Sequence, residues 1–123
     1  MTRWIVDGMN VIGSRPTGWW RDRPGAMRAL VGELEGFAGR ERERVTVVFD
    51  GRPFDLEGDG VEVLFATRRG RNAADDDIAA LVERDEDPGE LSVVTSDGDL
   101  SRRVAGAGAT VVGAGEFRRR LEG

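Results

Sequence analysis

The chain has 123 residues, the usual size of one domain, and 39% of them are hydrophobic, which is enough for one modest core. It has no histidine, cysteine, tyrosine or lysine, and all 18 basic residues are arginine. These absences exclude Ser-His-Asp and Cys-His catalysis, P-loop and Schiff-base lysines, disulfides, and zinc sites of imidazole or thiolate. The net charge of −5 argues against a general nucleic-acid coat protein, but not against a nuclease, because a bound metal reverses the local charge balance.

Short apolar strands alternate with helical patterns along the chain. In chain order we expect a strand at residues 3–7, a helix at 24–39, strands at 44–51 and 61–67, a helix at 72–85, a strand at 91–97, a helix at 99–109, a strand at 110–113 and a helix at 115–123. Pro24 suits the first turn of the first helix, and Asp22 is its expected cap. This alternation predicts one α/β domain over residues 1–123, with a parallel sheet covered by helices on both faces.

No stretch of 18 or more apolar residues indicates a membrane span, and the first residues lack the basic-then-apolar pattern of a signal peptide. We therefore expect a cytoplasmic protein.

Acidic residues gather where the predicted strands end. Asp7 ends the first strand and Asp50 the second, while Asp97 and Asp99 follow the fourth; residues 75–77, all aspartate, open the helix after the third. In a parallel α/β sheet, ligands bind outside the carboxyl ends of the strands. Because these ends share one edge of the sheet, we expect the acids to form a site there, although Asp50 could simply form a turn with the next glycine and Asp99 could cap a helix.

The helix after the third strand begins with three acids, of which one should face this site. At about 100° per residue, Asp75 lies about 60° from the apolar Ile78, whereas Asp76 lies about 160° away. We therefore expect Asp75 to be a ligand, and Asp76 and Asp77 to interact with the helix dipole.

Several carboxylates held together at pH 7 repel one another, so either some stay protonated or a divalent cation neutralises them. With no lysine or histidine to compensate, the cation is the better account. Acid-rich sites of this kind hold one or two Mg²⁺ or Mn²⁺ ions, which polarise a phosphate and activate water. We expect Asp7 and Asn10 to face such a metal, with Asn10 offering its neutral amide to the water or the substrate.

Arginines and tryptophans favour a phosphate-bearing substrate. Arginine binds phosphate oxygens bidentately, and exposed indoles stack on single-stranded bases. The residues expected to contact such a substrate are Arg68, Arg69, Arg71, Arg15, Arg21, Trp19 and Trp20. The alternatives are that the arginine run is a solvated loop and that the tryptophans pack into the protein.

Four segments occur in a recognisable order: IVDGMNVIG, VVFDG, NAADDDIAALV and VVTSDGDL, followed by GAGEFRRRL near the end. They resemble the NYN-domain ribonucleases, a branch of the PIN-like nucleases, and most closely the bacterial YacP-like group. The resemblance covers nearly the whole chain. It implies a three-layer α/β/α sandwich with strand order 3-2-1-4-5, and a metal-dependent endoribonuclease of RNA turnover or translation-linked mRNA decay. It also implies single-stranded or looped RNA as the partner, with association with the ribosome as an option.

Carried over position by position, the resemblance implies these catalytic residues: Asp7, Asn10, Asp50, Asp75 and Asp97. Among them, Asp7, Asp75 and Asp97 are the implied ligands of Mg²⁺ or Mn²⁺, and Asp99 is a further candidate. Family members often have one acid where this chain has three, which leaves Asp76 open as the ligand. Met9 stands where many relatives carry an aromatic residue, so no stacking role is assigned to it.

Two other classes of function compete with the nuclease. A catalytically silent RNA- or partner-binding module would have the same fold, but every acid of the pattern is present. A receiver-type phosphoacceptor domain also places acids at strand ends, but it needs a lysine that this chain lacks. A toxin-type ribonuclease with an antitoxin partner remains open within the nuclease class.

Overall fold

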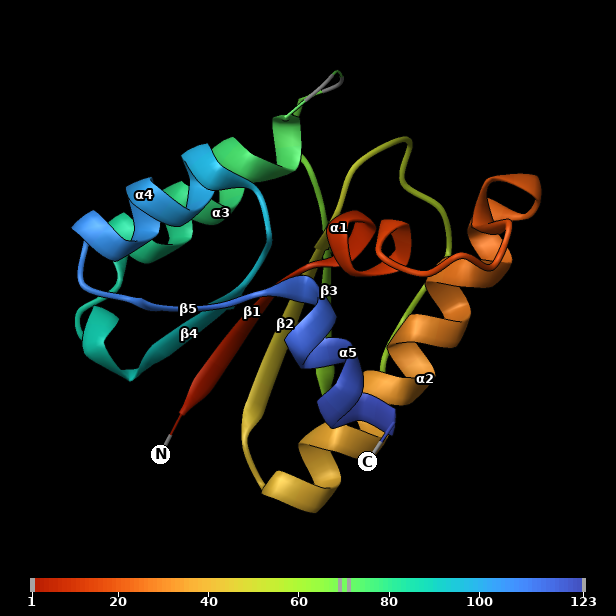
Figure 1. The fold of residues 1–123 in the computed structure, drawn as a ribbon, viewed down its shortest axis with the longest axis horizontal. Coiled ribbons are helices and arrows are strands. Elements are labelled where there is room, and N and C mark those ends of the chain that lie inside the picture. Colours follow the sequence, from red (N-terminus) through yellow and green to blue (C-terminus); the bar gives the residue numbers. More distant parts are fainter. Residues whose placement is uncertain (1, 69, 71, 123) are drawn as a thin grey trace.

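The computed structural model describes residues 2–68, 70 and 72–122, and at its centre lies a five-stranded, all-parallel sheet (Figure 1). The strand order is β3-β2-β1-β4-β5. The strands are β1 (Arg3–Asp7), β2 (Arg44–Phe49), β3 (Val61–Phe65), β4 (Leu91–Val94) and β5 (Thr110–Val112). The expected fold class is confirmed. Asp7 is the last residue of β1, the central strand.

Helices cover both faces of the sheet, as Figure 1 shows. On one face lie α1 (Gly8–Gly13), α2 (Arg23–Glu41) and α5 (Ala114–Glu122); on the other lie α3 (Ala73–Arg84) and α4 (Gly98–Gly106). Alternate residues of each strand enter the two hydrophobic clusters: Val45 and Val47 pack toward α2, whereas Val48 packs toward α3. Trp4 belongs to the first cluster, as expected, with ring centroids 5.4 Å from Phe37 and 5.3 Å from Phe117.

Helix α1 was not expected from the sequence, and it follows β1 without a loop. It has only six residues, too few for an apolar repeat to be seen, but Val11 and Ile12 are buried. The tight turn into it requires Gly8, because a Cβ atom at this position would lie 2.4 Å from Cε1 of Phe49. Two short 3-10 helices, η1 (Trp19–Arg21) and η2 (Pro88–Glu90), were also missed.

Four strands end earlier than the sequence pattern suggested, and the smallest difference is at β5, which stops at Val112 rather than at residue 113. β4 stops at Val94 rather than at residue 97, because the chain turns there to begin α4, with Asp97 as the N-cap. β2 and β3 stop at Phe49 and Phe65. The residues that follow these strands are therefore loop residues at the carboxyl edge of the sheet.

The start of α2 follows the sequence prediction closely. Asp22 Oδ1 accepts a hydrogen bond from the backbone N–H of Gly25 at 3.0 Å, and Pro24 lies in the first turn. Among the described residues, no helix combines the length and the apolar character needed to cross a membrane.

Candidate functional site

Asp7 ends the central strand in an almost fully buried position, with 4% of its surface exposed. Its Oδ2 accepts a hydrogen bond from the hydroxyl of Thr95, at 3.1 Å, from the loop after β4. Burial raises the pKa of Asp7 to about 7; the charges of Asp75 and Asp50 act in the same direction, and the Thr95 hydrogen bond opposes them. A cation close to Asp7 would therefore stabilise the ionised form of its carboxylate.

Asp75 lies in the first turn of α3 and faces the same pocket as Asp7. Burial raises its pKa to about 6, and the charges of Asp97 and Asp50 add to this effect. Asp76, the next residue, is not among the residues that line the pocket. It forms ion pairs with Arg103, at 2.9 Å, and with Arg68, and the Arg103 hydrogen bond lowers the pKa of Asp76 below its usual value.

Asp50 and Asp97 line the pocket and also hold the ends of helices. Oδ1 of Asp50 accepts from the backbone N–H of Ala74 at 2.9 Å, at the start of α3. Oδ1 of Asp97 accepts from the N–H of Leu100 at 2.8 Å, at the start of α4. Each side chain is thereby fixed in orientation, and in the described part of the chain its Oδ2 atom accepts no hydrogen bond. Both acids therefore combine a structural role with a free oxygen at the pocket.

Asn10 connects helix α1 to the loop after β4, beside the pocket. Its Oδ1 accepts from the backbone N–H of Ser96 at 2.8 Å, which links α1 to the β4–α4 loop. In the same loop, Oγ of Ser96 accepts from the N–H of Ala114 at 2.9 Å, at the start of α5. Thr95 accepts from the N–H of Asp97 at 3.1 Å while it donates to Asp7. Sequence reasoning missed Thr95, whose only indication was its place beside the predicted acidic edge.

The pocket at this edge has a volume of about 210 Å³. Its lining residues are Asp7, Met9, Asn10, Asp50, Asn72, Asp75 and Asp97. All five residues predicted as catalytic therefore meet in one place, and among the residues that the structure describes no basic side chain lines it.

The donor chemistry of the pocket suits a hard divalent cation, which prefers carboxylate and amide oxygens. Within residues 2–68, 70 and 72–122, no three acidic side chains are already close enough to enclose an ion on their own. Mg²⁺ does not need such a cage, because it keeps several waters and binds through one or two carboxylates together with substrate phosphates. Two acids with raised pKa values, the buried Asp7 and the half-buried Asp75, in an open pocket fit that mode of binding.

Asp99 lies outside the pocket, on the surface of α4. Its side chain is 86% exposed and forms an ion pair with Arg102 on the same helix. The alternative that Asp99 caps this helix is wrong, because Asp97 is the cap.

The residues predicted to bind RNA fall into different environments. Arg15 forms a double ion pair with Glu33, at 2.6 and 2.8 Å, and Arg68 is paired with Asp76. Arg21 is exposed at the end of η1. Arg69 and Arg71 lie outside the described residues.

The two tryptophans of η1 differ from each other. Trp19 packs against the hydrophobic core, whereas Trp20 is 63% exposed. Their ring centroids are 6.0 Å apart at an interplanar angle of 84°. Of the two, only Trp20 therefore offers a ring face to a ligand. Trp19 packs into the protein, as the alternative interpretation of these residues expected.

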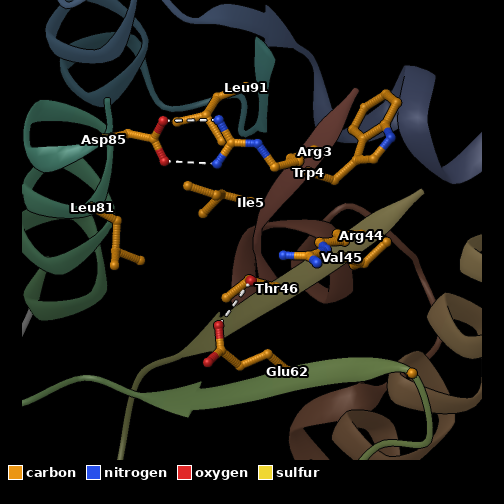
Figure 2. A pocket seen from close by; sticks show the side chains of 11 residues that line it. Arg3, Trp4, Ile5, Arg44, Val45, Thr46, Glu62, Leu81, Asp85 and Leu91 are labelled. Atoms are coloured by element: carbon orange, nitrogen blue, oxygen red, sulfur yellow. Dashed lines mark hydrogen bonds and ion pairs between the residues drawn. The ribbon is translucent and has the colours of Figure 1, made fainter. Parts of the chain in front are cut away.

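A second pocket, of about 460 Å³, lies at the opposite edge of the sheet (Figure 2). Here Arg3 at the start of β1 forms a double hydrogen bond with Asp85 at the end of α3, at 2.7 and 2.8 Å. Thr46 donates to Oε1 of Glu62 at 3.0 Å, and the side chain of Arg44 stands at the start of β2 (Figure 2). These contacts join neighbouring elements, and none of the predicted site residues lies among them.

The chain was compared with known protein families and with solved structures, and both comparisons found matches. The family described as YacP-like NYN domain matches residues 4–123. The crystal structure of Rae1 (YacP) from Bacillus subtilis is similar with a TM-score of 0.83 and 27% sequence identity, over 99% of this chain and 74% of that chain. Its W164L mutant gives the same TM-score with 28% identity, over 99% of this chain and 76% of that one. No curated protein matches the chain significantly.

Proposed function

Because the chain belongs to the YacP-like NYN domain family, a group of PIN-like nucleases, we propose that it is a metal-dependent endoribonuclease that hydrolyses RNA phosphodiester bonds. The observation that carries this proposal is the pocket at the carboxyl edge of the sheet, where four aspartates from four different segments face one another. Two of them have raised pKa values, which is typical of functional carboxylates. We propose that the protein acts in the cytoplasm, in RNA turnover or translation-linked mRNA decay.

The residues that would hold Mg²⁺ or Mn²⁺ are Asp7, Asp75 and Asp97, with Asp50 beside them. When bound, the ion supplies Lewis-acid chemistry: it polarises the phosphate and makes a nucleophile available from water at neutral pH. Asp75 is preferred to Asp76 as a ligand because Asp76 is already neutralised by Arg103 and Arg68.

The chain's own groups hold this arrangement in place before any substrate arrives. The Thr95 hydroxyl orients the carboxylate of Asp7, and the ends of α3 and α4 orient Asp50 and Asp97. Asn10 fixes the β4–α4 loop through its bond to Ser96. A site assembled in this way has little reorganisation left to do when the phosphodiester enters. Without histidine, a route through the 2′-hydroxyl is disfavoured, so we expect products with 5′-phosphate and 3′-hydroxyl ends.

RNA would also contact exposed residues in the loops outside the pocket. Trp20 and Arg21 lie in the segment between α1 and α2, and Arg68 lies in the loop that leads to α3. We propose that these three residues contact RNA, together with Arg69 and Arg71 outside the described residues. Arg15 contributes less, because Glu33 occupies its guanidinium.

The test is cleavage of end-labelled RNA, single-stranded and structured, with Mn²⁺, Mg²⁺ or EDTA. We expect cleavage that depends on the metal and that Asp7→Asn reduces at least about a hundredfold, since it removes a ligand charge. The matched control is Asp55→Asn, an exposed aspartate in the β2–β3 loop outside the pocket, which should cleave like the wild type. Binding of RNA without cleavage under any metal would contradict the enzyme and favour the silent RNA-binding module.

A further inference from the structure

The guanidinium of Arg23 contacts the backbone of Asp50, one of the residues that line the aspartate pocket. Arg23 is the first residue of α2, and its Nη2 donates a hydrogen bond to the backbone carbonyl of Asp50 at 3.0 Å. The same nitrogen would lie 3.3 Å from a Cβ atom at Gly51. Since Asp50 lines the pocket, Arg23 is tied through this backbone contact to one of the pocket's residues, although it is not itself among the lining residues.

This positive charge has no acidic partner in the part of the chain that the structure describes. The ion pairs found there involve other arginines, although the chain has 23 acidic and 18 basic residues. A guanidinium has five N–H donors, and the bond to the Asp50 carbonyl uses one of them. A cation in the first turn of a helix is also opposed by the helix dipole. Helix stability therefore does not account for an arginine at this position.

The backbone on both sides of the guanidinium is fixed. Asp22 caps α2, and a Cβ atom at Gly25 would lie 2.3 Å from Oδ2 of Asp22, so a larger residue there would displace the capping carboxylate. Gly51 has φ of +103°, a conformation that suits glycine, and the absence of a side chain leaves room for Arg23. The guanidinium is therefore held against the Asp50–Gly51 peptide while its other donors remain available.

Trp20 stands three residues before Arg23, at the other end of the same short segment. Its ring is 63% exposed, and Trp19, which packs on the core, supports it edge-on. An exposed indole can serve as a stacking platform for an unpaired base, and such stacking is indifferent to sequence. A base within a duplex is already stacked on its neighbours and has no free face to offer.

We propose that Arg23 binds the RNA phosphate that neighbours the cleaved one, with a base of the same strand stacked on Trp20. The inference rests on the proposed nuclease function. The four aspartates repel a phosphate, and Arg23 offers a compensating charge on the Asp50 side of the pocket. Charge-assisted hydrogen bonds to phosphate are the strong type, and arginine makes them bidentately.

The experiment compares the wild type with Arg23→Gln, Trp20→Ala and the control Arg44→Gln. Arg44 is also an exposed arginine, but it lies at the opposite edge of the sheet (Figure 2). Binding of a fluorescent unstructured RNA, and of the same sequence in a duplex, is measured in EDTA over a range of salt concentrations. KM and kcat for cleavage are then measured in Mn²⁺, and Tm is recorded for each variant.

We expect Arg23→Gln to weaken binding of the unstructured RNA about tenfold and to raise KM similarly, with Tm and kcat little changed. The slope of log K against log salt should fall by roughly 0.7, the contribution of one phosphate on a single strand. Trp20→Ala should reduce the preference for unstructured RNA over duplex, and Arg44→Gln should change nothing.

Two results would overturn the inference, and they can be told apart. In the first, the wild type is active and Arg23→Gln either behaves like it or loses kcat with an unchanged salt slope. Arg23 then does not bind phosphate, while the nuclease function stands. If the wild type neither binds nor cleaves RNA, the proposed function fails and the role of Arg23 fails with it.

Discussion

The hydroxyl of Thr95 donates a hydrogen bond to Oδ2 of Asp7 over 3.1 Å, and both residues are almost completely buried, at 1% and 4% exposure. This contact joins the ends of β4 and β1, the two strands at the centre of the acidic edge. Thr95 also accepts from the N–H of Asp97, so one side chain holds two of the proposed metal ligands. A neutral residue that carries out no chemistry itself thus positions the carboxylate of Asp7 and the backbone of Asp97.

Replacing Thr95 by valine keeps the shape of the side chain and removes both hydrogen bonds. Because the Thr95 bond holds the pKa of Asp7 down, the pKa should rise further and the ionised form should appear only at higher pH. We expect kcat/KM to fall about 10- to 100-fold at neutral pH, as for partners of metal ligands elsewhere. The acid limb of the pH profile of kcat/KM should move to higher pH.

The control for this substitution is Thr95→Ser, which keeps the hydroxyl and should retain most of the activity and the original pH profile. A valine variant with a normal profile would show that the hydrogen bond does not set the ionisation of Asp7.

Asp75 and Asp76 are adjacent, but their substitution should have opposite consequences. Asp75→Asn removes a carboxylate that faces the pocket, so cleavage should drop by at least about a hundredfold while Tm stays equal or rises, because a crowded charge is lost. Asp76→Asn breaks the ion pairs with Arg103 and Arg68 and leaves the pocket unchanged. It should keep activity within a few-fold, since exposed ion pairs contribute little. Steady-state cleavage of one RNA by both variants measures this, and a larger loss for Asp76 would make Asp76 the ligand.

Helical periodicity was enough to separate these two acids, and strand patterning was enough to place the acidic edge. Both depend on local geometry, namely the 100° step of a helix and the shared carboxyl edge of parallel strands. Strand order and the sandwich were reached through the family resemblance and are confirmed by the sheet.

What the sequence could not provide depends on contacts between distant segments. The pairing of Arg15 with Glu33, 18 residues away, and the capping of α3 by Asp50, 24 residues before Ala74, leave no local pattern. The same holds for Thr95, whose partner is 88 residues away. Helix α1 is too short for a periodic signal, and Asp97 rather than Asp99 caps α4 because β4 ends three residues before it.

The ion pair between Arg3 and Asp85 should stabilise the fold in a defined pH range. The hydrogen bonds from Arg3 lower the pKa of Asp85 to about 2, below its ordinary value of 3.8. The stabilisation is therefore fully present above about pH 4 and is lost as the pH falls toward 2. Asp85→Asn should lower Tm at pH 7, and the difference from the wild type should shrink at pH 2 to 3. Thermal unfolding followed by circular dichroism at both pH values tests this; a constant difference would mean that Asp85 acts through packing and not through charge.

Divalent cations should stabilise the folded protein if the aspartate pocket binds them. A ligand that binds only the native state adds about 2.7 kcal/mol at a hundred times its Kd. We expect Mg²⁺ or Mn²⁺ to raise Tm of the wild type at pH 8 and EDTA to reverse the rise. Asp75→Asn should weaken the response, and Asp55→Asn should not. Equal shifts in all three proteins would indicate general screening of the net negative charge and not a specific site.

The charge of Asp7 should make the metal-free protein less stable as the pH rises. Burial, as the main cause, raises the pKa of Asp7 from 3.8 to about 7, so the folded state binds a proton that the unfolded state has lost between these values. The free energy of unfolding therefore decreases as the pH rises from about 4 to 7, by at most about 4 kcal/mol, and stays low above that range. Asp7→Asn removes the charge, and its Oδ1 can still accept from Thr95. In EDTA, this variant should unfold at a higher Tm than the wild type at pH 8 and at a similar Tm near pH 4, although we expect it to lose the proposed activity. A variant less stable than the wild type at pH 8 would contradict the idea that the ionised carboxylate is a strain on the fold that metal binding relieves.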